Sequence, residues 1–188
     1  MSGREKENLI ADWLEEHKEE VVRTADYIFR HPETAYKEEL SSTYLASFLQ
    51  ENGFRVEKKT AGIDTAFTAA WGEGRPVIGF LAEYDALPEL GHACGHNLLG
   101  TGAAAAACAL KEDMERSGIP GTLRVYGCPA EEIMSGKIVM NRAGVFDDLD
   151  IAVTWHPFDR NRVSNDIWQA QDIKNYTFHG VSAHASRS

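Results

Sequence analysis

The sequence predicts an α/β fold, with a largely parallel sheet and helices on both of its faces. Two amphipathic helical stretches open the chain, and strand-like and helical stretches alternate after them. This alternation is typical of parallel sheets, because a connection between parallel strands usually contains a helix. The chain has 188 residues, 43 % of them hydrophobic, so it is long enough to bury the core of about one domain.

Helices are expected first. Apolar residues recur at helical spacing from Leu9 to Phe29 and from Leu40 to Leu49, and His31-Pro32 and Gly53 end the two runs. Their apolar stripes are expected to face the core, so we assign them no chemistry. The later pattern predicts strands over 66–71, 77–81, 122–126 and 150–154, and helices over 98–116 and 135–143.

Composition excludes several function classes. The formal net charge of −10 argues against nucleic acid and anionic membranes as partners, since both require clustered Lys and Arg. The charged N-terminus lacks the apolar core of a signal peptide, and histidine and glycine interrupt the uncharged stretch 90–110, which argues against a membrane span. Three cysteines without disulfide spacing fit a reducing compartment, so we expect a cytoplasmic protein.

Polar side chains follow three successive strands at the point where each strand ends. In an open α/β sheet, ligands bind outside the carboxyl ends of the strands, so we expect these side chains to converge. Thiolate, imidazole and carboxylate groups together are a ligand set that divalent metals such as zinc accept. The candidates are Asp85, Cys94, His96, Glu131, Glu132 and His156.

Each candidate alone also has a structural interpretation. Cys94 fits a small buried apolar residue, and His96 fits a residue at a helix start. The Glu131-Glu132 pair fits a solvated loop, and Trp155-His156-Pro157 fits a structural turn. Their joint placement at one sheet edge favours a metal site over these interpretations.

Five motifs carry a resemblance to a known family: Glu83-Tyr-Asp-Ala-Leu-Pro88, Gly91-His-Ala-Cys-Gly-His-Asn97, Pro129-Ala-Glu-Glu132, Trp155-His-Pro157 and Phe178-His-Gly-Val-Ser-Ala-His-Ala185. With them the chain resembles the amidohydrolase branch of the aminoacylase and carboxypeptidase family of two-metal hydrolases, from about Ala25 to Ser188. The resemblance implies a zinc-exopeptidase-like fold. Asn97 stands where many members have Asp, and Ile133-Met134 replaces a glycine-rich pair.

The resemblance also implies the role of each site residue. The implied metal ligands are Cys94, His96, Glu132 and His156, with Glu131 as general base, Asp85 supporting the site and His184 reaching substrate in a partner subunit's active site. It implies two divalent ions per complete site. Zinc is our first choice because of the thiolate, and manganese is second because carboxylate and imidazole suit it.

Family members are roughly twice as long as this chain. The resemblance therefore implies that residues 1–170 are the N-terminal part of a catalytic domain and residues 171–188 the start of a lid and dimerisation domain. A further metal-ligand histidine of the family lies beyond the matched region. We accordingly expect the 188-residue chain alone to bind metal weakly and to hydrolyse amides slowly or not at all.

Three functions are weighed. The first is hydrolysis of the amide bond of an N-acyl amino acid of the p-aminobenzoyl-glutamate type, with a small-molecule substrate and a homo-oligomer or partner subunit. The second, within the same family, is a dipeptidase or other N-acyl amino acid hydrolase. The third is a noncatalytic metal-binding remnant, because one ligand and much of the lid are not in this sequence.

Overall fold

The computed structural model describes residues 3–133, 135–163, 174, 176–177 and 179–180. Residues 1–157 form one compact unit and residues 158–188 a second. In the second unit, the described residues contain no helix or strand. The predicted boundary between residues 170 and 171 and the predicted role of His184 both involve residues outside the described ranges, so they stay predictions.

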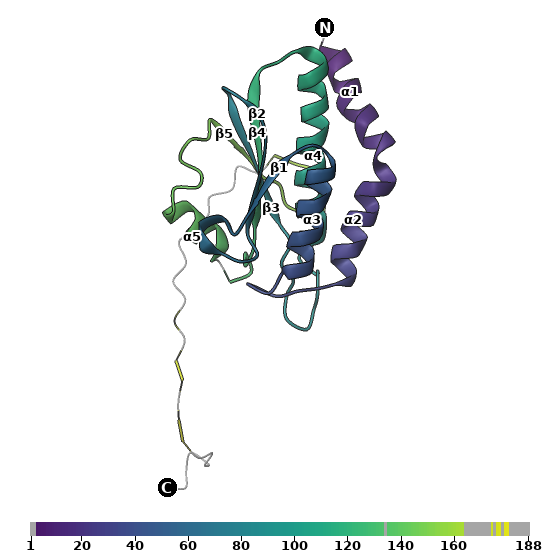
Figure 1. Ribbon diagram of the computed structural model, residues 1–188. Helices are drawn as coiled ribbons and strands as arrows, with labels where there is room; N and C mark the ends of the chain where they lie inside the picture. The colour runs from purple at the N-terminus through teal and green to yellow at the C-terminus, as the bar shows by residue number, and fades with distance from the viewer. Residues whose placement is uncertain (1–2, 134, 164–173, 175, 178, 181–188) are drawn as a thin grey trace. The chain divides into compact units, whose positions relative to one another are not determined.

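Four helices cover one face of the sheet (Figure 1). They are α1 (Gly3–Glu16), α2 (Lys18–Arg30), α3 (Glu39–Glu51) and α4 (His96–Ser117). The first predicted helical run is thus two helices, which meet at His17. The Trp13 carbonyl accepts from both the backbone N–H and the ring Nδ1 of His17, and the two rings stack. The apolar stripe continues across the junction, so periodicity did not reveal it.

The sheet has five strands in the order β1-β2-β4-β3-β5. They are β1 (Arg55–Lys58), β2 (Phe67–Glu73), β3 (Val77–Glu83), β4 (Gly121–Cys128) and β5 (Ile151–Val153). The α/β class is confirmed, and β3 pairs in parallel with both β4 and β5. The pairs β1–β2 and β2–β4 are antiparallel, so the sheet is mixed. The turn between β2 and β3 is too short to contain a crossover helix, so these two strands cannot be parallel neighbours. Instead, β4 lies between them, antiparallel to β2 and parallel to β3.

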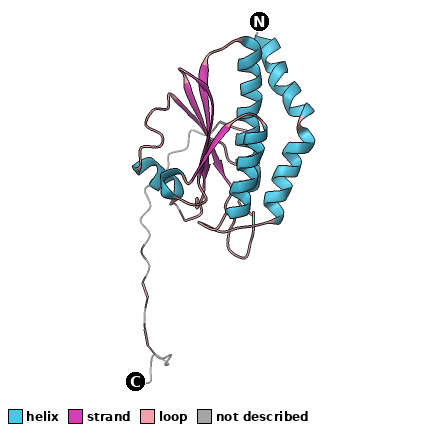
Figure 2. Ribbon diagram, viewed as in Figure 1, coloured by secondary structure: helices cyan, strands magenta, loops and turns pink. Residues whose placement is uncertain are grey.

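Strand alternation divides the core into two apolar clusters. On the face of α1–α4, Phe80, Leu123 and Val125 pack with the helices. On the opposite face, Tyr126 and Cys128 pack with Met140 of the short helix α5 (Gly136–Arg142). Helices therefore lie on both faces, as predicted, and Figure 2 shows α5 across the sheet from the four long helices.

This topology determines where the functional loops lie. The carboxyl ends of the parallel strands β3, β4 and β5 share one edge of the sheet. The loops 84–95, 129–135 and 154–157 leave from these three ends. These loops and His96, the first residue of α4, supply all the candidate ligands that the structure describes. Among the described residues, no helix has the length and apolar character needed to cross a membrane.

Candidate metal centre

His96, the first residue of α4, lies at the centre of the site and is fully buried. Its ring Nδ1 lies 2.9 Å from Asp85 Oδ1 and 3.1 Å from the Asp85 carbonyl oxygen, and both oxygens accept from it. A carboxylate on one ring nitrogen fixes the tautomer and orients the other nitrogen toward a metal. Nε2 is buried and has no hydrogen-bond partner among the described residues.

Cys94 and His156 approach the same point from two different loops. Cys94 Sγ lies 3.5 Å from His156 Nε2, and the rings of His96 and His156 are 5.6 Å apart. Donor atoms of these three residues all lie within 4.8 Å of one another. Gly95 makes the turn between Cys94 and His96 with φ +83°, and an added Cβ would lie 3.0 Å from Pro157 Cγ.

The two predicted carboxylates lie near different nitrogens of the His96 ring. Glu131 Oε2 is 3.7 Å from His96 Nε2, and Glu132 Oε1 is 3.8 Å from His96 Nδ1. Glu83 Oε2, for which the sequence predicted no role, lies 3.3 Å from Nε2. Glu83, His96 and Glu131 form a second group of donor atoms within 4.8 Å. The structure thus brings every described candidate to one place, and the division of roles between Glu131 and Glu132 stays a prediction.

The clustered carboxylates dominate the electrostatics. Burial, reinforced by Glu132, raises the pKa of Cys94 to about 12. Burial, reinforced by Glu83, also raises the pKa of Glu131. For His96, burial lowers the pKa, but Asp85 and the neighbouring carboxylates outweigh it and the net pKa is raised. Neighbouring carboxylates contribute to each of these three shifts, and a bound cation would neutralise their negative charge.

A second observation shows that the residues present fit a divalent metal. His96 Nε2 and Glu132 Oε1 are both buried and both lack a hydrogen-bond partner among the described residues. Buried polar atoms are normally paired, so two such atoms among thiol, imidazole and carboxylate groups fit a site that could hold a divalent ion.

Three site neighbours were not assigned from the sequence. Glu83 is buried at the end of β3 and binds Lys137 of α5, and Glu38 is fully buried beneath the loop 129–135. Glu83 stands two positions before Asp85, which was a usable signal. Lys137 and Glu38 gave no signal, because the site segments that they contact, at Glu83 and Ala130, are distant from them in sequence.

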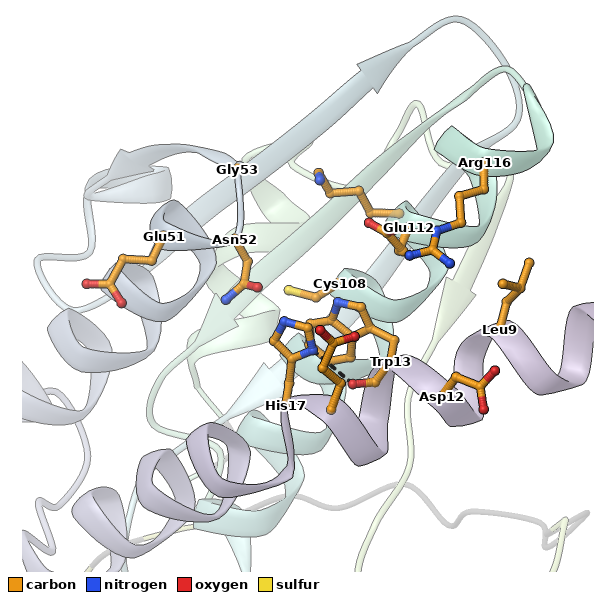
Figure 3. Close-up of a pocket in the computed structure, with 12 residues that line it drawn as sticks. Leu9, Asp12, Trp13, His17, Glu51, Asn52, Gly53, Cys108, Glu112 and Arg116 are labelled. Carbon is orange, nitrogen blue, oxygen red and sulfur yellow. Dashed lines mark hydrogen bonds and ion pairs between the residues drawn. The ribbon is translucent and has the colours of Figure 1, made fainter.

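A cavity of about 390 Å³ lies elsewhere, between α1, α3 and α4 (Figure 3). Trp13, His17, Asn52 and Cys108 are among the side chains that line it. None of the candidate ligands that the structure describes lines this cavity, so it is separate from the metal centre.

Comparison with known proteins identifies the family. The chain is 44 % identical to a subunit of p-aminobenzoyl-glutamate hydrolase from Escherichia coli, over 95 % of this chain and 41 % of that protein. It is 34 % identical to Xaa-Arg dipeptidase of Mus musculus, over 94 % of this chain and 43 % of that protein. The chain belongs to the amidohydrolase branch of the aminoacylase and carboxypeptidase family. No protein-family model matches the chain.

Solved structures support the fold of this chain. Bacillus subtilis YXEP, described as a dinuclear metal binding peptidase from the M20 family, matches 71 % of this chain and 41 % of its own, with a TM-score of 0.59 and 24 % identity. The aminobenzoyl-glutamate utilization protein from Klebsiella pneumoniae matches 77 % and 45 %, with a TM-score of 0.62 and 16 % identity. The chain spans about two fifths of the length of these two curated relatives.

Proposed function

We propose that this chain supplies metal-binding residues of an amidohydrolase that cleaves the amide bond of an N-acyl amino acid of the p-aminobenzoyl-glutamate type. The observation that carries the proposal is the convergence of Cys94, His96 and His156 donor atoms within 4.8 Å of one another. These residues come from two loops and the start of α4 at the carboxyl edge of the sheet, where α/β folds place their sites.

The proposed ligands of two divalent ions are Cys94, His96, Glu132 and His156, with zinc or manganese as the metal. When bound, such ions polarise an amide carbonyl and lower the pKa of water. Asp85 holds the His96 ring through Nδ1 and accepts from the Glu132 backbone N–H at 2.9 Å, so one buried carboxylate orients two proposed ligands.

Glu131 is the proposed general base. Its side chain is 35 % exposed, whereas that of Glu132 is 17 % exposed, so Glu131 has the better access to water and substrate. Its raised pKa suits a group that first accepts a proton from water and then donates it to the leaving amine. His184 is proposed to stabilise the oxyanion of the tetrahedral intermediate, which the resemblance alone supports.

The proposed substrate follows from the relatives. The Escherichia coli relative is named for p-aminobenzoyl-glutamate and the mouse relative for Xaa-Arg dipeptides, and the first shares more identity with this chain. An Xaa-Arg dipeptide is therefore the second substrate to test. We also propose a cytoplasmic location. A homo-oligomeric or partner-subunit assembly is proposed as well, because the Escherichia coli relative is named as one subunit of a hydrolase.

Metal binding tests the proposal on the chain itself. Zinc and cobalt are titrated into the purified protein, and the bound metal is measured by elemental analysis after desalting. Bound metal that is lost in Cys94→Ala and in His96→Ala supports the site, because a methyl group cannot replace a ligand. Unchanged metal content in both variants would show that the motif is structural.

Activity is tested with a chimera, in which the segment of the Escherichia coli relative that follows its matched region continues this chain. Hydrolysis of p-aminobenzoyl-glutamate, an Xaa-Arg dipeptide and hippurate is measured with zinc or manganese, beside the unextended chain. Preferential hydrolysis of p-aminobenzoyl-glutamate supports the proposed substrate. A metal-loaded chimera without turnover on any of the three would favour a noncatalytic metal-binding role.

A further inference from the structure

The segment between α2 and α3, residues 33–38, lies beneath the site loops and contacts two of them. The Glu33 carbonyl accepts from the backbone N–H of Ala86, next to Asp85, at 2.8 Å. The hydroxyl of Tyr36 makes a short hydrogen bond with the hydroxyl of Ser135, the last residue of the loop that carries the Glu131-Glu132 pair. The segment therefore contacts both loops that deliver carboxylates to the site.

Glu38 makes the most deeply buried of these contacts. Its side chain is fully buried, and its Oε1 accepts from the backbone N–H of Ala130 at 2.9 Å and of Tyr36 at 3.0 Å. Its Oε2 accepts from the Thr65 hydroxyl at 3.0 Å. A buried carboxylate is costly unless hydrogen bonds satisfy it, and here three donors from three separate segments do so.

The contact holds Ala130 in a conformation that alanine rarely adopts. Ala130 has φ +59°, in the left-handed region, which costs energy for any residue with a Cβ. Such a conformation persists only where surrounding contacts enforce it. Two hydrogen bonds are such contacts. The Ala130 N–H donates to the Glu38 carboxylate, and the Ala130 carbonyl accepts from the Ser135 N–H at 3.1 Å.

Glu131 is consequently held from both sides. The N–H of the residue before it, Ala130, donates to Glu38, and the N–H of the residue after it, Glu132, donates to Asp85 at 2.9 Å. Both accepting carboxylates are fully buried. Two buried anchors on flanking peptide groups leave the backbone of Glu131 little freedom.

We propose that Glu38 is a positioning residue that fixes the backbone of the Glu131-Glu132 pair by hydrogen bonding to Ala130. The inference rests on the proposed function, which assigns Glu131 as the general base and Glu132 as a metal ligand. Glu38 acts through hydrogen-bond geometry rather than charge. Gln at position 38 retains one acceptor oxygen for Ala130 and Tyr36, and its amide can donate to the Thr65 hydroxyl.

The test compares Glu38→Ala, Glu38→Gln and Leu49→Ala in the 188-residue chain. Leu49 is fully buried on α3, so its truncation lowers global stability without touching the loop. Amide hydrogen exchange of residues 129–135 is measured relative to that of β4, with the melting temperature and the cobalt dissociation constant of each variant. Because exchange is measured without metal, this readout remains valid if the proposed function fails.

We expect Glu38→Ala to speed exchange of 129–135 relative to β4 by at least about tenfold and to weaken cobalt binding about tenfold to a hundredfold, the range seen when residues that orient metal ligands are removed. Glu38→Gln should restore both to near the original values, and Leu49→Ala should lower the melting temperature alone. If Glu38→Ala does not fold, Glu38→Asp, whose shorter side chain withdraws the carboxylate from Ala130, replaces it with the same expectations.

Equal loop exchange in Glu38→Ala and Leu49→Ala would overturn the proposal, because Glu38 would then act on stability alone. Failure of Glu38→Gln to restore loop protection would overturn the geometric role in favour of charge. If the original chain binds no cobalt while loop exchange responds as expected, the proposed function fails and the positioning of the loop by Glu38 stands.

Discussion

His96 shows at the scale of one residue why the site is poised for a cation. One ring nitrogen is held by buried Asp85 and the other is buried beside Glu83 and Glu131 without a hydrogen-bond partner among the described residues. A neutral imidazole with its free nitrogen directed at carboxylates is stable only if a proton or a metal ion lies between them.

The role of Glu131 is tested by Glu131→Gln. An amide cannot accept the proton of water, so we expect turnover of the chimera to fall by about 10² to 10⁴ while bound metal is unchanged. Steady-state kinetics and elemental analysis measure the two quantities. Full activity in the variant would remove Glu131 from the role of base, and loss of metal would assign it as a ligand instead.

The proposed role of the Cys94 thiol as a metal ligand predicts that zinc affinity rises with pH. Burial and the nearby Glu132 raise the pKa of its thiol to about 12, so the thiol is protonated at neutral pH. Zinc binds the thiolate, so binding releases this proton and Cys94 contributes up to about tenfold in affinity per pH unit below the pKa. Competition with a chromophoric chelator between about pH 7 and 8.5 measures the slope. Cys94→Ala should lower the slope by about one logarithmic unit per pH unit, and an unchanged slope would contradict thiolate ligation.

At the scale of elements, the site depends on contacts between the helices and the ends of the strands. Lys137 of α5 binds Glu83 at the end of β3, which joins the face of the sheet that carries α5 to the metal centre. Trp155, just after β5, donates from its indole N–H to the Leu99 carbonyl of α4 at 3.1 Å. The Trp155 hydrogen bond ties the residue before His156 to α4, the helix that begins at His96.

The Lys137–Glu83 pair is tested by a double-mutant cycle. Lys137→Met leaves the Glu83 side chain, 6 % exposed, without its counter-charge, so we expect the free energy of unfolding to fall by about 1–3 kcal/mol. Adding Glu83→Gln should recover most of the loss. Urea denaturation measures all variants. The exposed pair Lys18–Glu15 is the control, and Lys18→Met should change stability by less than about 0.5 kcal/mol. A coupling energy near zero would mean that solvent, and not Lys137, balances Glu83.

Gly102→Ala is expected to be an exception to the stabilisation that helix propensity predicts for Gly→Ala. Gly→Ala inside a helix ordinarily stabilises by about 1 kcal/mol. A Cβ at Gly102 would lie 2.8 Å from Trp155 Cζ2, so Gly102→Ala must displace the indole that precedes His156. We expect lower thermal stability and weaker cobalt binding, whereas Ser47→Ala on the exposed face of α3 should change neither. A stabilised Gly102→Ala variant with unaltered cobalt affinity would show that Trp155 moves freely.

At the scale of the whole molecule, the proposed ligands join loops that leave three different strands. Metal binding should therefore stabilise the entire sheet, by about 2.7 kcal/mol at a free metal concentration of about 100 times the dissociation constant. Thermal unfolding with zinc and with EDTA measures this effect. His96→Ala should abolish it, and a zinc effect that persists in this variant would place the stabilising metal elsewhere.

The sequence by itself determined the α/β class, the main helices and strands, and the metal-ligand candidates. Those features are local: helical and strand periodicity appear within short stretches, and Cys94 and His96 are two residues apart. Chain order and the rule that sites form at the carboxyl ends of strands then sufficed to predict that the loops 84–95, 129–135 and 154–157 meet.

The tertiary structure alone decided the mixed sheet order, the pairing of polar β1 and the positions of Glu83, Lys137 and Glu38. β1 has one apolar residue, Val56, so its pairing with β2 comes from backbone hydrogen bonds that no side-chain pattern encodes. Glu38 and Ala130 are 92 residues apart, yet one hydrogen bond joins them. Such a contact depends on the packing of separate segments, which composition and periodicity do not specify.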